Sequence, residues 1–343
     1  MTRSPLARLL DPRPLTGTEA RRVFARLVDP KGTDAERAGL LVALAARPLT
    51  VDELAAFARE MRQRARPFPV PSGDRAIDLC GSGGARTPSF NVSTVSALVV
   101  AAAGAAVVKH GNRSATGICG SSDLLEALGL PVTTSVAYAR ATYRRRRIAF
   151  LHAPLYHPAT RAVAATRRAL GIATVFNRLG PLSNPARVAY QLAGAPDPGH
   201  ARTCASVLQR LGIVRGLSMA SRDGCDEFSP HAETVAFAWN GARFARRSFR
   251  PEAFLTAPER RGAWTALPPS RAAAEVDRLL AGGPGARRGA VLLTSGAALS
   301  LTGAASSVEE GVGIARETLD SGASAELLAD LRDLARAYRE GRP

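Results

Sequence analysis

The first seventy residues follow the pattern of amphipathic helices. Apolar residues recur at spacings of three and four, which place Leu40, Leu41, Leu44 and Ala45 on one helical face and Leu54, Phe57 and Met61 on another. Three Thr/Ser-x-x-Glu sequences typical of a capping box precede such patterns, namely Thr33 with Glu36, Thr50 with Glu53, and Ser307 with Glu310. The helical block ends in the stiff, proline-rich residues 66–73, where we place a joint between two domains.

After this joint, short apolar runs alternate with glycine loops and helical stretches. We expect strands at residues 76–80, 105–109, 148–151, 188–192, 216–220 and 289–293, and helices at 93–103, 122–129 and 158–170. Such alternation is typical of an α/β fold, in which a large, mainly parallel sheet carries helices on both faces. The expected division is a small all-helical domain, residues 1–72 with about 156–181, and a large α/β domain, residues 73–155 with about 182–343.

The composition is typical of a globular protein whose cysteines are reduced. Of the 343 residues, 46% are hydrophobic and 22% are charged, and no run of eighteen uncharged apolar residues exists that could span a membrane. The first residues lack the apolar core of a signal peptide. The four cysteines, at 80, 119, 204 and 225, show no CxxC spacing. We therefore expect a cytoplasmic protein without structural disulfides and without a membrane partner.

The net charge of +17 has three possible meanings. It arises because only 29 residues are acidic, and its densest cluster is the run from Arg144 to Arg147. A basic surface can bind nucleic acid, attract a polyanionic small substrate, or simply be solvated. Aromatic residues make up only 5% of the chain and are not interleaved with the arginines, which argues against a stacking surface for single strands.

Lysine is rare in this chain and therefore informative. Of 46 basic residues only Lys31 and Lys109 are lysine, and Lys109 lies in the run Lys109-His110-Gly111-Asn112-Arg113. A compact ammonium group is a good partner for a single phosphate oxygen.

Two glycine-rich loops each follow a predicted strand and precede a predicted helix. The first runs from Asp78 through Gly81, Gly83 and Gly84 to Thr94, and the second runs from Lys109 to Asp123. Backbone amides of such loops bind anions, although glycine is equally common in ordinary strand–helix turns. The first loop matches neither the P-loop nor the GxGxxG pattern. Because parallel strands end at one edge, both loops together indicate a ligand with more than one phosphate.

Two further patches could contribute chemistry. The segment Asp223-Gly224-Cys225-Asp226-Glu227 gathers carboxylates in an acid-poor chain, and predicts either a magnesium site facing substrate phosphates or a solvated acidic turn. The segment from Phe176 to Pro185, with Arg167 upstream, is a rigid turn at a possible hinge between the helical insert and the sheet. His110 is either a buried structural histidine or an acid–base group.

Taken together, these patches resemble the anthranilate phosphoribosyltransferases. That family shows GTGGD before N-[IV]-S-T, then KHGNR, GS-x-D, RR-x-LG with FN-x-x-GPL-x-NP, and DG-x-DE. This chain contains counterparts in the same order over roughly residues 15–330. The resemblance implies a small helical domain joined to a large α/β domain, as in the nucleoside phosphorylases, and a homodimer formed through the helical parts. The KHGNR and GPL-x-NP matches argue against a pyrimidine nucleoside phosphorylase.

The resemblance also implies roles for individual residues. Phosphoribosyl pyrophosphate would contact Gly81, Gly84, Ala85, Ser89, Asn91, Val92, Ser93, Thr94, Lys109, His110, Gly111, Asn112, Arg113, Thr116, Gly117 and Ser121. Anthranilate would contact Gly81, Asn112 and Arg167, whose guanidinium suits a carboxylate. Magnesium (Mg²⁺) would be held by Ser93, Asp226 and Glu227, and the residues most directly involved in catalysis would be Lys109, Asp226 and Glu227.

The implied reaction is displacement of pyrophosphate from C1 of the ribose by the amine of anthranilate, a step of tryptophan biosynthesis. It needs stabilisation of the leaving pyrophosphate and no covalent nucleophile. Two departures from the family pattern stand out: Ala85 and Arg86 replace an aspartate and a glycine, and residues 116–119 replace a lysine- and serine-containing run. They leave open the same transfer to another aromatic acid. A non-catalytic nucleic-acid-binding homologue is the other alternative.

Overall fold

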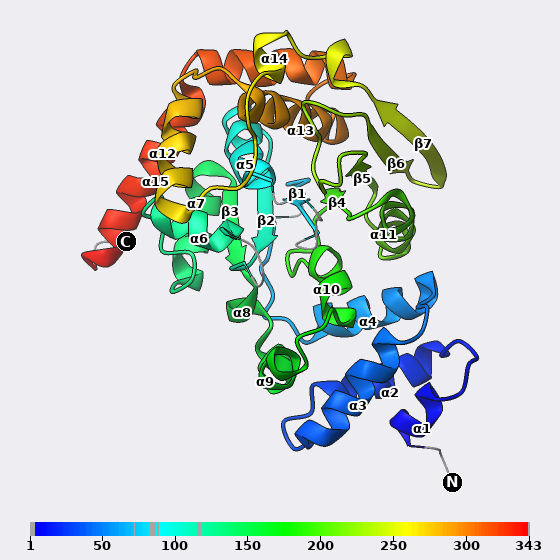
Figure 1. Cartoon of the computed structure of the whole chain (residues 1–343). Helices are drawn as coiled ribbons and strands as arrows, with labels where there is room; N and C mark the ends of the chain where they lie inside the picture. Colours follow the sequence, from blue (N-terminus) through cyan, green and yellow to red (C-terminus); the bar gives the residue numbers. More distant parts are fainter. Residues whose placement is uncertain (1–3, 72, 83–86, 88, 115–117, 342–343) are drawn as a thin grey trace.

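A computed structural model describes residues 4–71, 73–82, 87, 89–114 and 118–341. Within these residues, seven strands form one sheet in the order β3-β2-β1-β4-β5-β6-β7 (Figure 1). The first five are parallel, and β6 and β7 extend the sheet as an antiparallel pair. The strands are β1 Ile77–Cys80, β2 Val107–Gly111, β3 Ile148–His152, β4 Tyr190–Gly194, β5 Arg215–Ser221, β6 Thr234–Asn240 and β7 Arg243–Phe249.

Helices cover both faces of the sheet because successive strand residues point to opposite sides. In β3, Ile148 and Phe150 join one apolar core, whereas Ala149 and Leu151 join the other. The first core is closed by α5 Val92–Ala102, α6 Ser121–Ala127, α7 Val136–Arg146, α12 Pro269–Leu280, α13 Ala286–Thr302, α14 Val308–Asp320 and α15 Ala323–Arg339. The predicted α/β fold with helices on both faces is confirmed.

The second core continues from the sheet into the N-terminal helices. It includes residues of α2 Gly17–Leu27, α3 Asp34–Ala45, α4 Val51–Gln63, α9 Arg161–Leu170, α10 Val175–Leu179 and α11 Pro198–Arg210. Figure 1 shows α2, α3 and α4, together with α1 Pro5–Leu9, grouped at one end of the molecule. Helix α9 packs on α3, where Thr166 donates a hydrogen bond to Asp34 at 2.9 Å. The two-domain division remains a prediction, which this packing supports.

Helix starts follow capping chemistry, but only one of the three predicted capping boxes is complete. Thr50 and Glu53 form a complete capping box, and so do Thr16 and Glu19, a pair that was not among the predictions. Thr33 and Ser307 each accept a hydrogen bond from the backbone three residues later, but their glutamates bond elsewhere, Glu36 to Arg26 and Glu310 to Ser306.

The strand predicted at residues 289–293 is wrong, because these residues lie inside α13. That helix is buried on nearly all sides, so its apolar run shows no face preference and resembles a buried strand. The antiparallel pair β6 and β7 was not predicted, although the two-residue loop Gly241-Ala242 that joins them, with glycine in its first position, is typical of a hairpin. No helix within the described ranges has both the length and the apolarity that a membrane crossing requires.

A pair of buried histidines joins β2 to the segment after α8 Ala153–Tyr156. The rings of His110 and His157 meet edge to face with centroids 5.0 Å apart, and both side chains are buried. Burial lowers the pKa of His157 to about 4 and holds that of His110 well below its ordinary value, which the neighbouring His157 lowers further. Both imidazoles are therefore neutral in the folded chain at pH 7.

We expect this pair to make folding stability fall in mild acid. As pH falls below about 6.5, an unfolded chain protonates His157 whereas the folded chain does not. The stability contributed above pH 6.5 is thus lost progressively down to pH 4, and about 2 kcal/mol should disappear between pH 7 and pH 5. Chemical denaturation at both pH values should show a weaker pH dependence for His157→Leu. The exposed His231→Leu should keep the wild-type dependence; identical behaviour of all three would contradict the prediction.

Candidate functional site

The candidate site lies where four parallel strands end. Gly81 follows β1, Gly111 and Gly194 end β2 and β4, and Ser221 ends β5. In a parallel sheet these ends share one edge, so the loops that follow them meet there. The structure thereby brings the first glycine loop and the acidic segment together.

Asp226 and Glu227 are held against the first loop by hydrogen bonds. The backbone amide and the hydroxyl of Ser82 donate to Oδ2 of Asp226 at 2.6 and 2.7 Å. The amide of Ser93, in the first turn of α5, donates to Oε1 of Glu227 at 3.3 Å. Both acidic side chains are buried, so the predicted acidic pair is part of the interior and is not a solvated turn.

Two glycines allow this close approach. A Cβ atom on Gly81 would lie 3.0 Å from Oδ2 of Asp226, and one on Gly194 would lie only 1.8 Å from the Asp226 carbonyl oxygen. Glycine at the end of β4 therefore has a steric cause rather than a conformational one. Gly81 was among the predicted site residues, whereas Gly194 was not, because it follows a strand without any glycine-rich pattern around it.

Lys109 sits beside the acidic pair but is almost fully enclosed, with 3% of its surface exposed. Its ammonium group donates to the Leu79 carbonyl oxygen at 2.5 Å and to the Ser93 hydroxyl at 3.2 Å. Its positive charge opposes the rise of the Glu227 pKa. The side chain thus contributes charge from within the protein, and the predicted direct contact with a phosphate remains a prediction.

The electrostatics of Glu227 favour a bound cation. Burial, and then the neighbouring Asp226, raise the pKa of Glu227 to about 8. Its Oε2 atom is buried and has no hydrogen-bond partner in the described part of the chain. Two close carboxylates with a free oxygen are a suitable donor set for a hard divalent ion. Within the same residues no three His, Cys, Asp or Glu side chains form a metal cluster, so further oxygen donors would have to come from Ser93 and a substrate.

The first loop and the second loop touch each other through Asn91. Its Nδ2 atom donates to the Cys119 carbonyl oxygen at 3.0 Å, while its Oδ1 atom is buried without a partner among the described residues. Ser89 forms an isolated antiparallel bridge with Thr265. Four predicted donor-binding residues, Gly84, Ala85, Thr116 and Gly117, and also Arg86, lie outside the described residues.

Several other predicted donor-binding residues face away from solvent. The side chains of Val92 and Thr94 are buried in α5, and that of His110 packs on His157, so these three could offer a ligand only backbone groups. Arg113 is engaged by Asp123 at 2.9 Å and by Glu126.

The remaining residues of the second loop pack closely on one another. The Ser121 hydroxyl donates to the Asn112 carbonyl oxygen at 3.2 Å, and a Cβ atom on Gly111 would lie 2.2 Å from that hydroxyl. Asn112 itself is exposed.

A cleft of about 330 Å³ adjoins the acidic pair, between the N-terminal helices and the sheet domain. Ser82 and Gly194 form its inner end, and most of its lining is apolar. Arg178 of α10 also lines it; burial lowers the pKa of its guanidinium, which has no hydrogen bond or ion pair with any described residue. Arg178 was not among the predicted site residues, although a charged residue between Phe176 and Leu179 in a buried turn was a usable signal.

Arg167, the predicted partner of the acceptor carboxylate, lies on α9 at the other side of α10. Its Nη2 atom donates to Oδ1 of Asn177 at 3.3 Å, and its guanidinium stacks on the Phe176 ring at 5.1 Å. Burial lowers its pKa from the usual arginine value. These contacts hold the side chain in place and leave part of it accessible.

Comparisons with known proteins agree with this architecture over nearly the whole chain. A family model described as glycosyl transferase family, a/b domain, matches residues 73–325, and one described as glycosyl transferase family, helical bundle domain, matches residues 3–65. Anthranilate phosphoribosyltransferase 2 of Streptomyces coelicolor is 40% identical over 316 residues, which are 92% of this chain and 94% of that one. The chain belongs to the anthranilate phosphoribosyltransferase family.

Other members and solved structures extend the comparison. The Lactiplantibacillus plantarum enzyme is 38% identical over 331 residues, 96% of this chain and 97% of its own. The crystal structure of the anthranilate phosphoribosyltransferase from Thermus thermophilus has a TM-score of 0.88 at 36% identity and covers 98% of this chain and 100% of its own. The Saccharomyces cerevisiae family member, solved in complex with PRPP and Mg, has the same fold, with a TM-score of 0.85, 22% identity and 97% coverage of both chains. The resemblance inferred from the motifs is confirmed.

The steric role of Gly194 can be tested by substitution. In Gly194→Ala the new methyl group must displace the Asp226 backbone, so we expect the free energy of unfolding to fall by about 2 kcal/mol or more in chemical denaturation. Gly313→Ala in α14 is the matched control, because a Cβ atom there meets nothing within 4 Å. Equal stability of the two variants would rule out the proposed constraint.

Proposed function

We propose that this protein transfers the 5-phosphoribosyl group of phosphoribosyl pyrophosphate to the amine of anthranilate and releases pyrophosphate. The observation that carries this proposal is the buried pair Asp226 and Glu227, which is held against the first glycine loop beside a mostly apolar cleft. Membership of the family supports the same reaction. No side chain needs to act as a covalent nucleophile, because the amine attacks C1 directly as the pyrophosphate departs.

Magnesium fits the residues present at this edge of the sheet. Asp226, Glu227 and the hydroxyl of Ser93 would hold it, and Oε2 of Glu227, which has no hydrogen-bond partner among the described residues, is an oxygen that a cation would satisfy. When bound, the ion would neutralise charge that develops on the leaving pyrophosphate. A magnesium ion is present in the PRPP complex of the Saccharomyces cerevisiae protein, a family member of the same fold.

The donor would lie across the two glycine loops. The N-terminus of α5 directs backbone amides towards this region, and helix N-termini stabilise phosphate groups. Asn91 and Ser121 add side-chain groups at the point where the loops converge. Lys109 adds a fixed positive charge beneath them, which stabilises developing negative charge without contacting solvent.

The acceptor would occupy the cleft, with its carboxylate paired to an arginine. Arg167 is the family-like candidate but is not among the residues that line the cleft, whereas Arg178 lines the cleft and has no hydrogen bond or ion pair with a described residue. This extra cation favours an alternative acceptor, an aromatic amine with a further acidic group, as the second candidate function. Asn112 would orient the amine towards C1.

We also propose that the protein forms a homodimer through its N-terminal helices. Leu10 at the end of α1 is 75% exposed and Val42 of α3 is 43% exposed, and exposed apolar side chains on neighbouring helices favour association. The nucleic-acid alternative has little support, because Arg146 pairs with Asp330 at 2.5 Å and Arg147 pairs with Asp74 at 2.6 Å.

Removing either acidic charge should impair catalysis. Asp226→Asn and Glu227→Gln should each lower kcat/KM by about 100-fold, because the magnesium ion that would neutralise the leaving pyrophosphate loses a negatively charged ligand. Anthranilate fluorescence, followed with phosphoribosyl pyrophosphate and magnesium, gives the rate. The exposed Glu309→Gln serves as the matched control and should retain wild-type activity. Full activity of both site variants, or of the wild type in excess chelator, would reject the proposed role.

The two arginines can be separated by their effect on the acceptor. Arg167→Met should raise the KM for anthranilate by about 10- to 100-fold, since a charged hydrogen bond is lost, with little change in the KM for the donor. Arg178→Met should leave the KM for anthranilate largely unchanged. It should raise the KM for aromatic amines that carry a second acidic group. If only Arg178→Met affects anthranilate, the assignment of Arg167 is wrong.

A further inference from the structure

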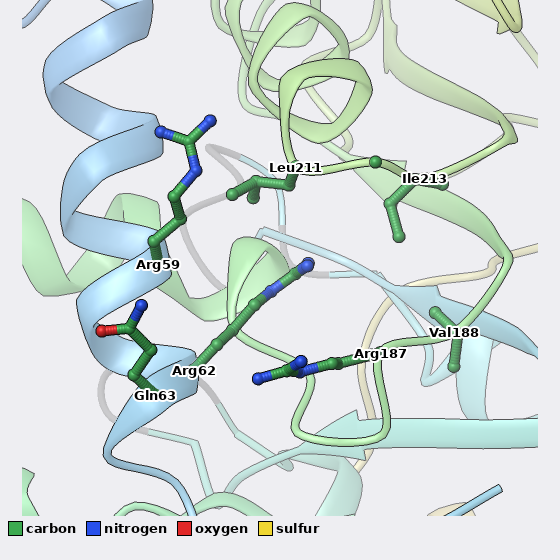
Figure 2. A pocket seen from close by; sticks show the side chains of 8 residues that line it. Arg59, Arg62, Gln63, Arg187, Val188, Leu211 and Ile213 are labelled. Atoms are coloured by element: carbon green, nitrogen blue, oxygen red, sulfur yellow. The ribbon is translucent and has the colours of Figure 1, made fainter.

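A basic pocket lies away from the candidate active site. It has a volume of about 310 Å³ and is bounded by α4 on one side and by the segments that precede β4 and β5 on the other. Figure 2 shows Arg62 and Arg187 reaching into it from these opposite sides, with Arg59 on the same helix face as Arg62. Leu211, Ile213 and Val188 provide an apolar wall. The volume is at the lower end of the roughly 300–1,000 Å³ that is typical of small-molecule sites.

Three arginines line this pocket without a carboxylate. Its lining contains Arg59, Arg62 and Arg187 and no acidic residue, and none of the three forms an ion pair within the described part of the chain. Arg59 donates to the Arg210 carbonyl oxygen at 3.2 Å, and Nε of Arg62 donates to the Leu182 carbonyl oxygen at 2.7 Å. The charge of the pocket is therefore left uncompensated by the residues that form it.

Arg62 carries the clearest sign of a missing partner. Its Nη2 atom is buried and has no hydrogen-bond acceptor among the described residues. Burial lowers the pKa of Arg62 to about 10, an effect that Asp78 opposes and Arg187 reinforces. A buried donor without an acceptor is costly in a folded protein, and an anion in the pocket would satisfy it.

Arg187 reaches the pocket from a backbone conformation that arginine rarely adopts. Its φ angle is +48°, in the left-handed region that favours glycine and asparagine. A residue of this kind persists where its surroundings require it, and such positions concentrate at ligand sites. The same geometry makes glycine an acceptable replacement, which is useful for a test.

We propose that this pocket binds a small anion that carries a phosphate group, held by the forked donors of Arg62 and Arg187 with Arg59 at the rim. The site differs from the candidate active site, because Val188 and Ile213 precede β4 and β5 whereas the acidic pair lies beyond their carboxyl ends. The five residues of β4 separate the two edges by roughly 15 Å. An anion there connects α4 with the sheet domain.

Calorimetric titration of the full chain with inorganic phosphate, at low ionic strength and with a chelator present, tests this proposal. We expect one phosphate to bind the wild type, and Arg187→Gly to bind it at least tenfold more weakly. Arg59→Gln changes an exposed residue of α4 and should also weaken phosphate binding, so it provides a second variant. Arg144→Gln removes an equal charge from the exposed end of α7 and should bind phosphate as the wild type does.

The outcomes separate a built site from general surface charge. Equal phosphate affinity of the wild type and Arg187→Gly, or an equal loss in Arg144→Gln, would overturn the proposal. Arg187→Gly should also keep its transferase activity within about twofold, since Arg187 does not line the cleft. Phenyl phosphate is the second ligand: tighter binding than inorganic phosphate indicates an organic monoester that uses the apolar wall, and equal binding indicates the inorganic ion.

Discussion

The contact between the Asp226-Glu227 segment and the ends of β1 and β4 is the constraint on which the site depends. Ser82 fixes Asp226 by two hydrogen bonds, and Gly194 leaves the room that its carbonyl oxygen occupies. Without that close approach the acidic segment would project into solvent, where its carboxylates would keep ordinary pKa values and bind a cation weakly. The ends of β1 and β4 therefore hold two carboxylates in a buried position with little access to water.

Burial of like charges is tolerated here because an opposite charge lies within the same layer. Lys109 lowers the pKa of both Asp78 and Glu227, although burial is the larger effect and still raises that of Asp78 to about 6. Asp78 also accepts a hydrogen bond from the His110 amide at 3.1 Å, so β1 and β2 are tied together by the same group. An arrangement of this kind is stable without a ligand, yet leaves one carboxylate oxygen of Glu227 available to a cation.

Much of this arrangement could be predicted from the sequence, and the failures have physical reasons. Glycine loops after buried strands, and an acidic run in an acid-poor chain, are local patterns, so the meeting of Gly81 with Asp226 followed once the strands were taken as parallel. No local pattern marks Gly194, because the need for glycine there comes from the carbonyl oxygen of Asp226, thirty-two positions later. The apolar residues 289–293 were misassigned since a helix enclosed on all sides has no polar face. A charged residue between Phe176 and Leu179 is a local signal, but Arg178 was passed over because its position at the cleft follows only from the fold.

The use of lysine at position 109, in a chain whose basic residues are nearly all arginine, has an explanation in packing. The ammonium of Lys109 meets two acceptors, the Leu79 carbonyl and the Ser93 hydroxyl, in a space with 3% exposure. A guanidinium would bring five donors and a rigid plane into that space and leave several of them unsatisfied. Arg62 illustrates this cost, because one of its nitrogens is buried without an acceptor among the described residues. Lysine is thus suited to the enclosed charge beneath the active edge, whereas arginine is suited to a pocket that remains open to an anion.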